Sequence, residues 1–382
     1  MDFSFSEDQL TIFNSIKENA IKGLNDDIFT DDENSTFSRT KWNICGDMGI
    51  YGMPVPEQYG GEGFDMLTTA LAMKALGYGC QDEGLMLSIC AHLCTFIIPI
   101  VIYGTEEQKK KYLPDACSGK MIGGNGISEA NAGSDISSIE TKVDKQEDRY
   151  ILKGSKIFVT NGPIADTLVI YAKHSNGLKM FDMSALLVNK DEFKYGQQFK
   201  KMGLRTSPLC EIVLDDCSIP EDRLIGRQCF GLKAFQTSMH WERIITSAYN
   251  IGAMERQFET VHEYTNTRTQ FGNKISNFAN ISDKLVDMKM KIELANLMLY
   301  KTCWNFDNGS RDMSDASMLK LYVSEAKVSN SLNAVHLFGA YGYLKESIVE
   351  KQLRDAISST IYSGTSEIQR KIISERLGKF YE

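Results

Sequence analysis

The spacing of apolar residues changes twice along this 382-residue chain, and the change restricts its fold more than any single motif does. Over residues 2–115, apolar side chains recur at the period of a helix face, about 3.6 residues. Over residues 120–227 the period falls to about two, which is typical of strands. After Gly231 the helical period returns. The sequence therefore predicts a helical N-terminal domain, a β-rich middle domain and a helical C-terminal domain, with borders at residues 1–117, 118–228 and 229–382.

Short runs within these domains predict individual elements. TLVIYAK, MSALLVNK and CEIVLDD are expected to be strands, and RYILKGSKIFVTNG is typical of a hairpin with Lys153 and Gly154 at its turn. In the C-terminal domain, Ile244, Ile251 and Phe258 recur every seven residues. This stripe predicts long amphipathic helices that pack in a bundle.

Charge and hydropathy exclude two classes of partner. The formal net charge is -8 and basic residues form no long block, which argues against nucleic acid because phosphate neutralisation needs clustered Lys and Arg. We expect no apolar stretch long enough to cross a bilayer, and the start MDFSFSEDQL lacks the basic and apolar regions of a signal peptide. A cytoplasmic protein without a membrane partner is the expectation.

The cysteines predict reduced thiols rather than disulfides or a metal site. Nine cysteines are scattered without a CxxC pair. In the segment CAHLC, a helix would place Cys90 and Cys94 on one face and His92 elsewhere, so a metal would find at most two ligands. A buried apolar helix is the expected role of this segment, and no metal is predicted.

Motifs for several common chemistries are missing. The sequence contains no Walker motif, HExxH or GxSxG. GGNG and YGGEG are glycine turns that lack the spacing of a dinucleotide-binding fingerprint. Nicotinamide and ATP chemistry therefore have no support in the sequence.

A series of motifs along the whole chain resembles the acyl-CoA dehydrogenase family. They are YGMPVPEQYGGEG, YGTEEQKKKYLP, GISEANAGSD, GSKIFVTNG, ERIITSAYNIGAMERQFE, TRTQFGNKI, FGAYGY, RDA and YSGTSEIQR, in that order. The resemblance implies a helical domain, a β-barrel-like domain and a four-helix-bundle-like domain in sequence order. It also implies non-covalent FAD, oxidation of an acyl thioester between Cα and Cβ, and a homotetramer built as a dimer of dimers.

The resemblance also implies where the cofactor and substrate bind. The turn before Ser134 presents backbone N–H groups to an anion, as a pyrophosphate requires. Without the resemblance, hydroxyls such as those of Ser128 and Thr160 would be read as strand groups satisfied within the sheet. Glu367 is expected to bind the cofactor or to cap the following helix. The implied cofactor residues are Ile127, Ser128, Gly133, Ser134, Phe158, Thr160, Arg268, Phe271, His336, Gly339, Ala340, Thr365, Ser366 and Glu367, and the implied substrate residues are Ser134, Arg243, Ser363 and Gly364.

Two features of this cofactor site involve other subunits or depart from the family. Arg268 and Phe271 match residues that reach the cofactor of a neighbouring subunit, and a guanidinium suits a diphosphate. Ala279 and His336 stand where relatives often carry glutamine. FAD is expected to bind with altered adenine contacts.

The base is the critical assignment, because removing the α-proton of a thioester requires a carboxylate. Many family members carry a glutamate immediately before the Gly-Thr of the last motif, where this chain has Ser363, and serine does not titrate near neutrality. The isovaleryl-CoA and long-chain branches instead use a glutamate just before an arginine at the start of the third domain. Glu242 and Arg243 occupy that place, so Glu242 is the predicted base.

The acyl group and its carrier remain open in the sequence. The chain is similar to the prolyl-carrier-protein oxidases of the anatoxin-pathway type, which implies a prolyl thioester on a phosphopantetheinyl carrier protein. A short or branched acyl-CoA is the alternative, and either an electron-transfer flavoprotein or oxygen would accept the electrons. A non-catalytic flavoprotein, a scaffold and a flavin monooxygenase stay open as readings of a different class.

Overall fold

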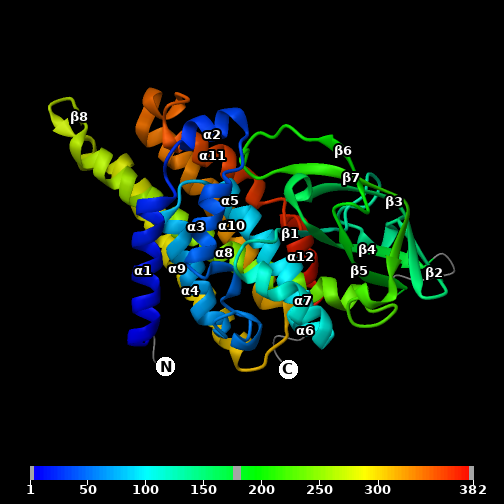
Figure 1. Cartoon of the computed structure of the whole chain (residues 1–382). Helices are drawn as coiled ribbons and strands as arrows, with labels where there is room; N and C mark the ends of the chain where they lie inside the picture. The colour runs from blue at the N-terminus through cyan, green and yellow to red at the C-terminus, as the bar shows by residue number, and fades with distance from the viewer. Residues whose placement is uncertain (1–3, 175–181, 378–382) are drawn as a thin grey trace.

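The computed structural model describes residues 4–174 and 182–377, and it shows helices at both ends of the chain with a curled sheet between them (Figure 1). The sheet lies to one side of the helices, and the red helix α12 lies near the border between the two parts. The order helix, strand, helix confirms the order expected from the apolar spacing. An acyl-CoA dehydrogenase fold of this kind was the architecture implied by the motifs.

The N-terminal part consists of short helices with clear start signals. Ser6 caps α1 with a capping box to Gln9, and Thr105 caps α7 in the same way with Gln108. Helix α4 is buried on nearly all sides, so it packs as a core helix rather than as a surface stripe. The helices are α1 (Glu7–Gly23), α2 (Ile28–Asn34), α3 (Arg39–Asp47), α4 (Met66–Gly79), α5 (Glu83–Cys90), α6 (Ile98–Tyr103) and α7 (Glu106–Cys117), with short 3-10 turns η1 (Ile50–Gly52) and η2 (Glu57–Tyr59).

Helices α5 and α6 are joined by a π-helical segment, η3 (Ala91–Ile97), into one apolar rod. The expectation that no stretch is long enough to cross a bilayer was wrong, because the rod Glu83–Tyr103 is 21 residues long and contains an 18-residue window with a mean hydropathy of 2.4. Its best window is 83% buried inside the protein, so packing in the core accounts for the apolar composition. The rod packs between α8 and strand β1.

The residues of CAHLC are buried within this rod. The Gly123 backbone N–H donates to His92 Nδ1 at 2.9 Å, and His92 Nε2 lies 3.0 Å from the Ala116 carbonyl oxygen. Burial lowers the pKa of His92 to about 4, so the ring is neutral and acts as a structural bridge. Among the described residues, no group of three or more His, Cys, Asp or Glu side chains could hold a metal.

The middle part is a seven-stranded mixed sheet with the order β1, β4, β2, β3, β7, β6, in which β5 pairs with β4. Strands β4, β5 and β7 confirm the three strands expected from TLVIYAK, MSALLVNK and CEIVLDD. Its inner side chains form a core of their own around Leu152, Leu168 and Ile212. The strands are β1 (Gly123–Gly126), β2 (Lys142–Gln146), β3 (Arg149–Thr160), β4 (Thr167–His174), β5 (Met183–Asn189), β6 (Lys194–Gln198) and β7 (Leu209–Pro220).

The expected hairpin at Lys153 and Gly154 is wrong, because β3 runs without interruption through both residues. The register against β7 shifts between Leu152 and Gly154, so the glycine lies in a β-bulge. Its φ is +149°, and a Cβ there would lie 2.6 Å from Thr141 Oγ1. The tight turn lies at Glu147 instead, between β2 and β3.

The C-terminal part is built on the long helix α8, which crosses α4 at two glycines. A Cβ on Gly77 would lie 2.2 Å from the Tyr249 carbonyl oxygen, and a Cβ on Gly252 would lie 2.0 Å from the Lys74 carbonyl oxygen. The two backbones are therefore in direct contact. The helices are α8 (Gly231–Thr267), α9 (Ala279–Asp307), α10 (Met313–Phe338), α11 (Ile348–Ser359) and α12 (Ser366–Ser374), with the hairpin β8 (Thr269–Gln270) and β9 (Asn273–Lys274) and the turn η8 (Gly339–Tyr343).

Candidate active site

The predicted base lies next to the residue that replaces the usual glutamate. Glu242 is on the apolar stripe of α8 with 8% of its surface exposed, and Ser363 is in the turn between α11 and α12. Ser363 Oγ donates a hydrogen bond to Glu242 Oε1 at 2.8 Å. The structure thus brings together two residues that are 121 positions apart in the sequence.

Burial gives the Glu242 carboxyl an unusually high pKa. Its removal from water raises its pKa to about 7, although the Ser363 hydroxyl and the positive charges of Arg243 and Lys320 oppose the rise. Arg243 is also buried, and its guanidinium donates to the Ser363 carbonyl and to Ser317 Oγ, each at 3.3 Å. A carboxylate that titrates near neutral pH is suited to take and release a proton.

The turn that carries Ser363 is fixed by its backbone carbonyls. Gln369 Nε2 donates to the carbonyl oxygens of Ser363 and Gly364 at 3.0 and 2.9 Å, and Lys320 Nζ donates to Gly364 at 2.8 Å. Thr365 caps α12, since its hydroxyl accepts the Ile368 N–H at 3.4 Å. Thr365 is thus the N-cap residue, while Glu367 lies in the first turn, where its own backbone N–H lowers the pKa of its carboxyl, and its contact with the cofactor stays a prediction.

A chain of polar side chains behind this turn was not predicted. Tyr362 Oη lies 2.7 Å from Tyr249 Oη and accepts from Asn250 Nδ2 at 3.0 Å. Lys327 donates to Asn250 Oδ1 and forms a buried ion pair with Glu83. These residues come from four separate segments, so no local motif could have revealed the chain.

A pocket of about 430 Å³ is lined on α8 by residues that end at His240 and Trp241, directly before Glu242, although neither Glu242 nor Ser363 is among its lining residues. Its walls come from α6, α8 and the connection between α9 and α10. Lys233 and Arg311 supply positive charge, and Trp241 supplies a buried indole whose N–H has no hydrogen-bond partner among the residues that the structure describes. His240 is neutral near pH 7, because burial lowers its pKa to about 4. Sequence reasoning missed this pocket, since its residues share no motif.

The predicted cofactor residues of the middle domain gather at one end of the sheet, where the segment after β1 meets the end of β3. Ile127 and Ser128 follow β1, while Phe158 and Thr160 lie on β3, and the Ser128 carbonyl accepts the Ile157 N–H at 2.9 Å. In the described part of the chain, neither the Ser128 nor the Thr160 hydroxyl bonds to another protein group. The reading of both as hydroxyls satisfied within the sheet is therefore wrong.

Other groups at this end of the sheet and in the last motif are also open to a ligand. Phe158 is 57% exposed with a φ of +55°, which holds an aromatic ring away from the core. Gly133 and Ser134 are exposed, and a Cβ on Gly133 would meet no atom within 4 Å. Ser366 Oγ is buried and has no hydrogen-bond partner in the described segments of the chain. Open backbone, an exposed aromatic and unpaired hydroxyls fit a flavin dinucleotide.

The remaining cofactor candidates lie at the far end of α8. The hairpin β8 projects from the body of the molecule (Figure 1), and Phe271 at its tip is 92% exposed. The Arg268 guanidinium lies 5.8 Å from the Tyr341 ring centre, close to Gly339 and Ala340 in η8, and His336 is exposed at the end of α10. Within one chain, these residues of the C-terminal domain lie far from the cofactor candidates of the middle domain (Figure 1). Ala279, one of the two departures, begins α9 and is exposed.

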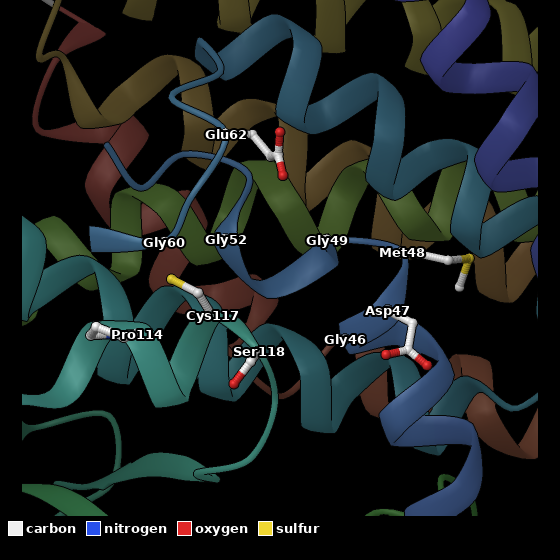
Figure 2. Close-up of a pocket in the computed structure, with 10 residues that line it drawn as sticks. All are labelled: Gly46, Asp47, Met48, Gly49, Gly52, Gly60, Glu62, Pro114, Cys117 and Ser118. Atoms are coloured by element: carbon white, nitrogen blue, oxygen red, sulfur yellow. The ribbon is translucent and has the colours of Figure 1, made fainter. Parts of the chain in front are cut away.

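A second hollow, of about 460 Å³, contains none of the predicted site residues (Figure 2). Glu62 and Asp47 are on its rim, and glycines form much of its wall. A Cβ on Gly46 would lie 2.6 Å from the Ser118 carbonyl oxygen, so close backbone packing explains that glycine. Burial raises the pKa of Cys117 to about 12, which makes its thiol unreactive.

Comparisons with known proteins identify the family. Models of the acyl-CoA dehydrogenase N-terminal, middle and C-terminal domains match residues 6–120, 124–217 and 230–378. An L-prolyl-[peptidyl-carrier protein] dehydrogenase of a Serratia species is 38% identical over 99% of this chain and 98% of its own. A short-chain specific acyl-CoA dehydrogenase of Clostridium acetobutylicum is 34% identical over 99% of this chain and 100% of its own.

Solved structures agree with these matches. The crystal structure of the prolyl acyl carrier protein oxidase AnaB has a TM-score of 0.96 at 40% identity and covers 98% of this chain and 100% of its own. PigA with FAD and proline has a TM-score of 0.96 at 38% identity, with 99% of each chain covered. The chain belongs to the acyl-CoA dehydrogenase family.

Proposed function

We propose that this protein is an FAD-dependent dehydrogenase or oxidase of an acyl thioester, and that its substrate is an L-prolyl group on a phosphopantetheinyl carrier protein. The contact between buried Glu242 and Ser363, beside the pocket lined by Lys233 and Arg311, is the observation that carries the proposal. The prolyl-carrier-protein enzymes among the relatives support the choice of substrate.

The end of the sheet that carries Ser128 and Thr160, together with the last motif, holds the cofactor in this proposal. Within residues 4–174 and 182–377, the hydroxyls of Ser128, Thr160 and Ser366 make no hydrogen bond to another protein group, and Phe158 offers an exposed ring. The FAD relatives support this cofactor. Bound FAD supplies the acceptor for the hydride that leaves the substrate.

Glu242 acts as the general base in this proposal. Its carboxylate takes the α-proton of the thioester, and a pKa of about 7 leaves a large ionised fraction near neutral pH. The fixed turn around Ser363 and Gly364 faces the same space and orients the acyl group. Arg243 holds that turn through the Ser363 carbonyl.

The pocket beside Glu242 accommodates the phosphopantetheine arm. Lys233 and Arg311 lie at its rim, where the phosphodiester and the acidic surface of a carrier protein would meet positive charge. An electron-transfer flavoprotein or oxygen takes the electrons from the reduced enzyme. A cytoplasmic location fits the absence of an exposed apolar helix long enough to span a membrane in the described residues.

Assembly as a homotetramer is part of the proposal. Helix α9 exposes a stripe of large apolar side chains that a monomer would leave in water. The projecting hairpin with Arg268 and Phe271 is suited to reach a neighbouring subunit's cofactor. The exposed stripe consists of Val286, Met290, Leu294, Leu297 and Trp304.

An anaerobic titration tests the proposed reaction. The purified holoenzyme is mixed with L-prolyl carrier protein, isovaleryl-CoA or butyryl-CoA, and the flavin absorbance is followed. Bleaching by the prolyl carrier protein alone supports the proposal. Bleaching only by an acyl-CoA would establish a short- or branched-chain acyl-CoA dehydrogenase instead, and no bleaching by any thioester would indicate a non-catalytic flavoprotein or a monooxygenase.

A further inference from the structure

We propose that Ser363 is a positioning residue for the base: its hydroxyl holds the Glu242 carboxylate in one orientation and favours its ionised form. The inference rests on the proposed function, in which Glu242 takes the substrate proton. It assigns a distinct task to the residue that occupies the place of the usual glutamate.

The hydrogen bond between the two side chains is isolated. Within the described part of the chain, Ser363 Oγ makes the one hydrogen bond that the Glu242 carboxylate receives, at 2.8 Å. No ion pair reaches Glu242 there, although Arg243 is the next residue, because the Arg243 guanidinium bonds to the Ser363 carbonyl and Ser317 Oγ. Both Glu242 and Ser363 are only 8% exposed, so water does not replace the hydroxyl easily.

The backbone at Ser363 is strained and nevertheless carries a side chain. Its φ is +56°, in the left-handed region that glycine adopts freely and other residues rarely adopt. Gln369 and Lys320 fix this conformation through the carbonyls of Ser363 and Gly364. Glycine would fit the same turn without strain, so what serine adds at this point is the hydroxyl that meets Glu242.

The chemical effect of the hydroxyl follows from its role as a donor. A hydrogen bond to a carboxylate stabilises the charged form over the protonated form. Burial already raises the pKa of Glu242 to about 7 with this bond in place. Without the Ser363 hydroxyl, one of the groups that lower the pKa of Glu242 is lost while burial still raises it, so the carboxyl should ionise only at a higher pH.

Two substitutions separate the hydroxyl from the backbone. Ser363→Ala keeps the Cβ and its strain but removes the donor, whereas Ser363→Gly removes the donor and relieves the strain. Infrared difference spectra of the holoenzyme across a pH titration follow the Glu242 carboxyl band, which is assigned by its loss in Glu242→Gln. The pH profile of anaerobic flavin reduction is measured in parallel.

We expect both variants to raise the apparent pKa by at least about half a unit in both measurements, which lowers the rate on the acidic side about threefold. Ser359→Ala is the matched control, since Ser359 is buried and its hydroxyl bonds only to backbone carbonyls. It should leave both pKa values unchanged. An unshifted carboxyl band in Ser363→Ala with a wild-type flavin spectrum would overturn the inference.

Separate results would reject the role of Ser363 and the role of Glu242. Normal flavin reduction by Glu242→Gln would remove Glu242 as the base, and with it the role of Ser363, but would leave the thioester oxidation in place, which only a failure of every thioester to bleach the wild-type flavin would reject. A dead Glu242→Gln combined with an unshifted Ser363→Ala would leave the base in place and reject only the role of Ser363.

Discussion

The hydroxyls of Tyr249 and Tyr362 lie 2.7 Å apart in the protein interior, and Tyr362 directly precedes the Ser363 that bonds to Glu242. This pair connects the turn of the last motif to α8, two helical turns after Glu242. The position of the turn therefore depends on a buried hydrogen bond that is remote from the reacting atoms.

Removing the Tyr362 hydroxyl should destabilise the protein. Tyr362→Phe leaves the Asn250 amide, which donates to that hydroxyl at 3.0 Å, without its acceptor, and such a loss costs about 1–3 kcal/mol. Urea unfolding of the holoenzyme measures the difference. Tyr343→Phe is the control, because Tyr343 is 84% exposed, and an equal midpoint for the two variants would contradict the prediction.

Replacing the base should separate binding from chemistry. Glu242→Gln keeps the size of the side chain but cannot accept a proton, so we expect FAD content and fold to be unchanged and flavin reduction to stop. Absorbance under anaerobic conditions measures both. Glu263→Gln, on the exposed part of the same helix, should reduce at the wild-type rate. More than a few per cent of the wild-type rate in Glu242→Gln would reject the assignment.

The rate of flavin reduction should fall in acid. A base with a pKa of about 7 is protonated below that pH, and each further pH unit removes about nine tenths of the remaining active form. The rate should therefore drop about tenfold per unit below pH 7 and level off above it. Stopped-flow reduction between about pH 5.5 and 8.5 tests this. A rate that stays constant down to the lowest pH would mean that the base titrates far below the expected value.

The rim of the pocket should matter for the carrier rather than for the chemistry. Lys233→Ala and Arg311→Ala remove exposed positive charge next to the pocket, so we expect KM for the prolyl carrier protein to rise several-fold with kcat nearly unchanged. The effect should shrink at high salt. Lys153→Ala, on the outer surface of β3, is the control, and an equal rise in KM there would point to a general charge effect.

Moving the carboxylate from position 242 to position 363 tests whether both positions face the substrate proton. Ser363→Glu combined with Glu242→Gly should recover part of the flavin reduction, since the side chains of residues 242 and 363 meet at 2.8 Å. Ser363→Gln with Glu242→Gly is the matched control without a base. If the first double variant binds flavin and is as inactive as the second, a carboxylate at position 363 does not reach the substrate proton.

Sequence spacing was sufficient for the domain order and for three strands of the sheet, because both depend on where apolar side chains recur. The same reasoning failed at Gly154, where a glycine that suggested a turn lies in a bulge of a continuous strand. A glycine marks an unusual backbone without saying whether the chain reverses there. The length of the apolar rod Glu83–Tyr103 was also underestimated. The rod is continuous because the π-helical segment Ala91–Ile97 joins α5 to α6.

The roles of Glu242 as base and Ser363 as the replacement of the usual glutamate came from the resemblance of the motifs to a family, not from spacing, and neither source predicted the hydrogen bond between them. The pocket with Lys233, Trp241 and Arg311 and the polar chain around Tyr362 carry no motif. Their residues are ordinary in type and far apart in sequence. The packing of α8 against the surrounding helices is what brings these residues together.

The backbone contact of α4 with α8 at Gly77 and Gly252 has a consequence for redesign. No side chain fits between α4 and α8 at this crossing. Helix α8, which carries Glu242, therefore cannot shift or rotate to make room for a larger residue. The turn at Ser363 and Gly364, on the other side of Glu242, is held by hydrogen bonds from a few side chains. Those side chains can be substituted more easily than the helix crossing. New acyl specificities in this scaffold should therefore be sought in libraries that vary the turn and leave the helix crossing untouched.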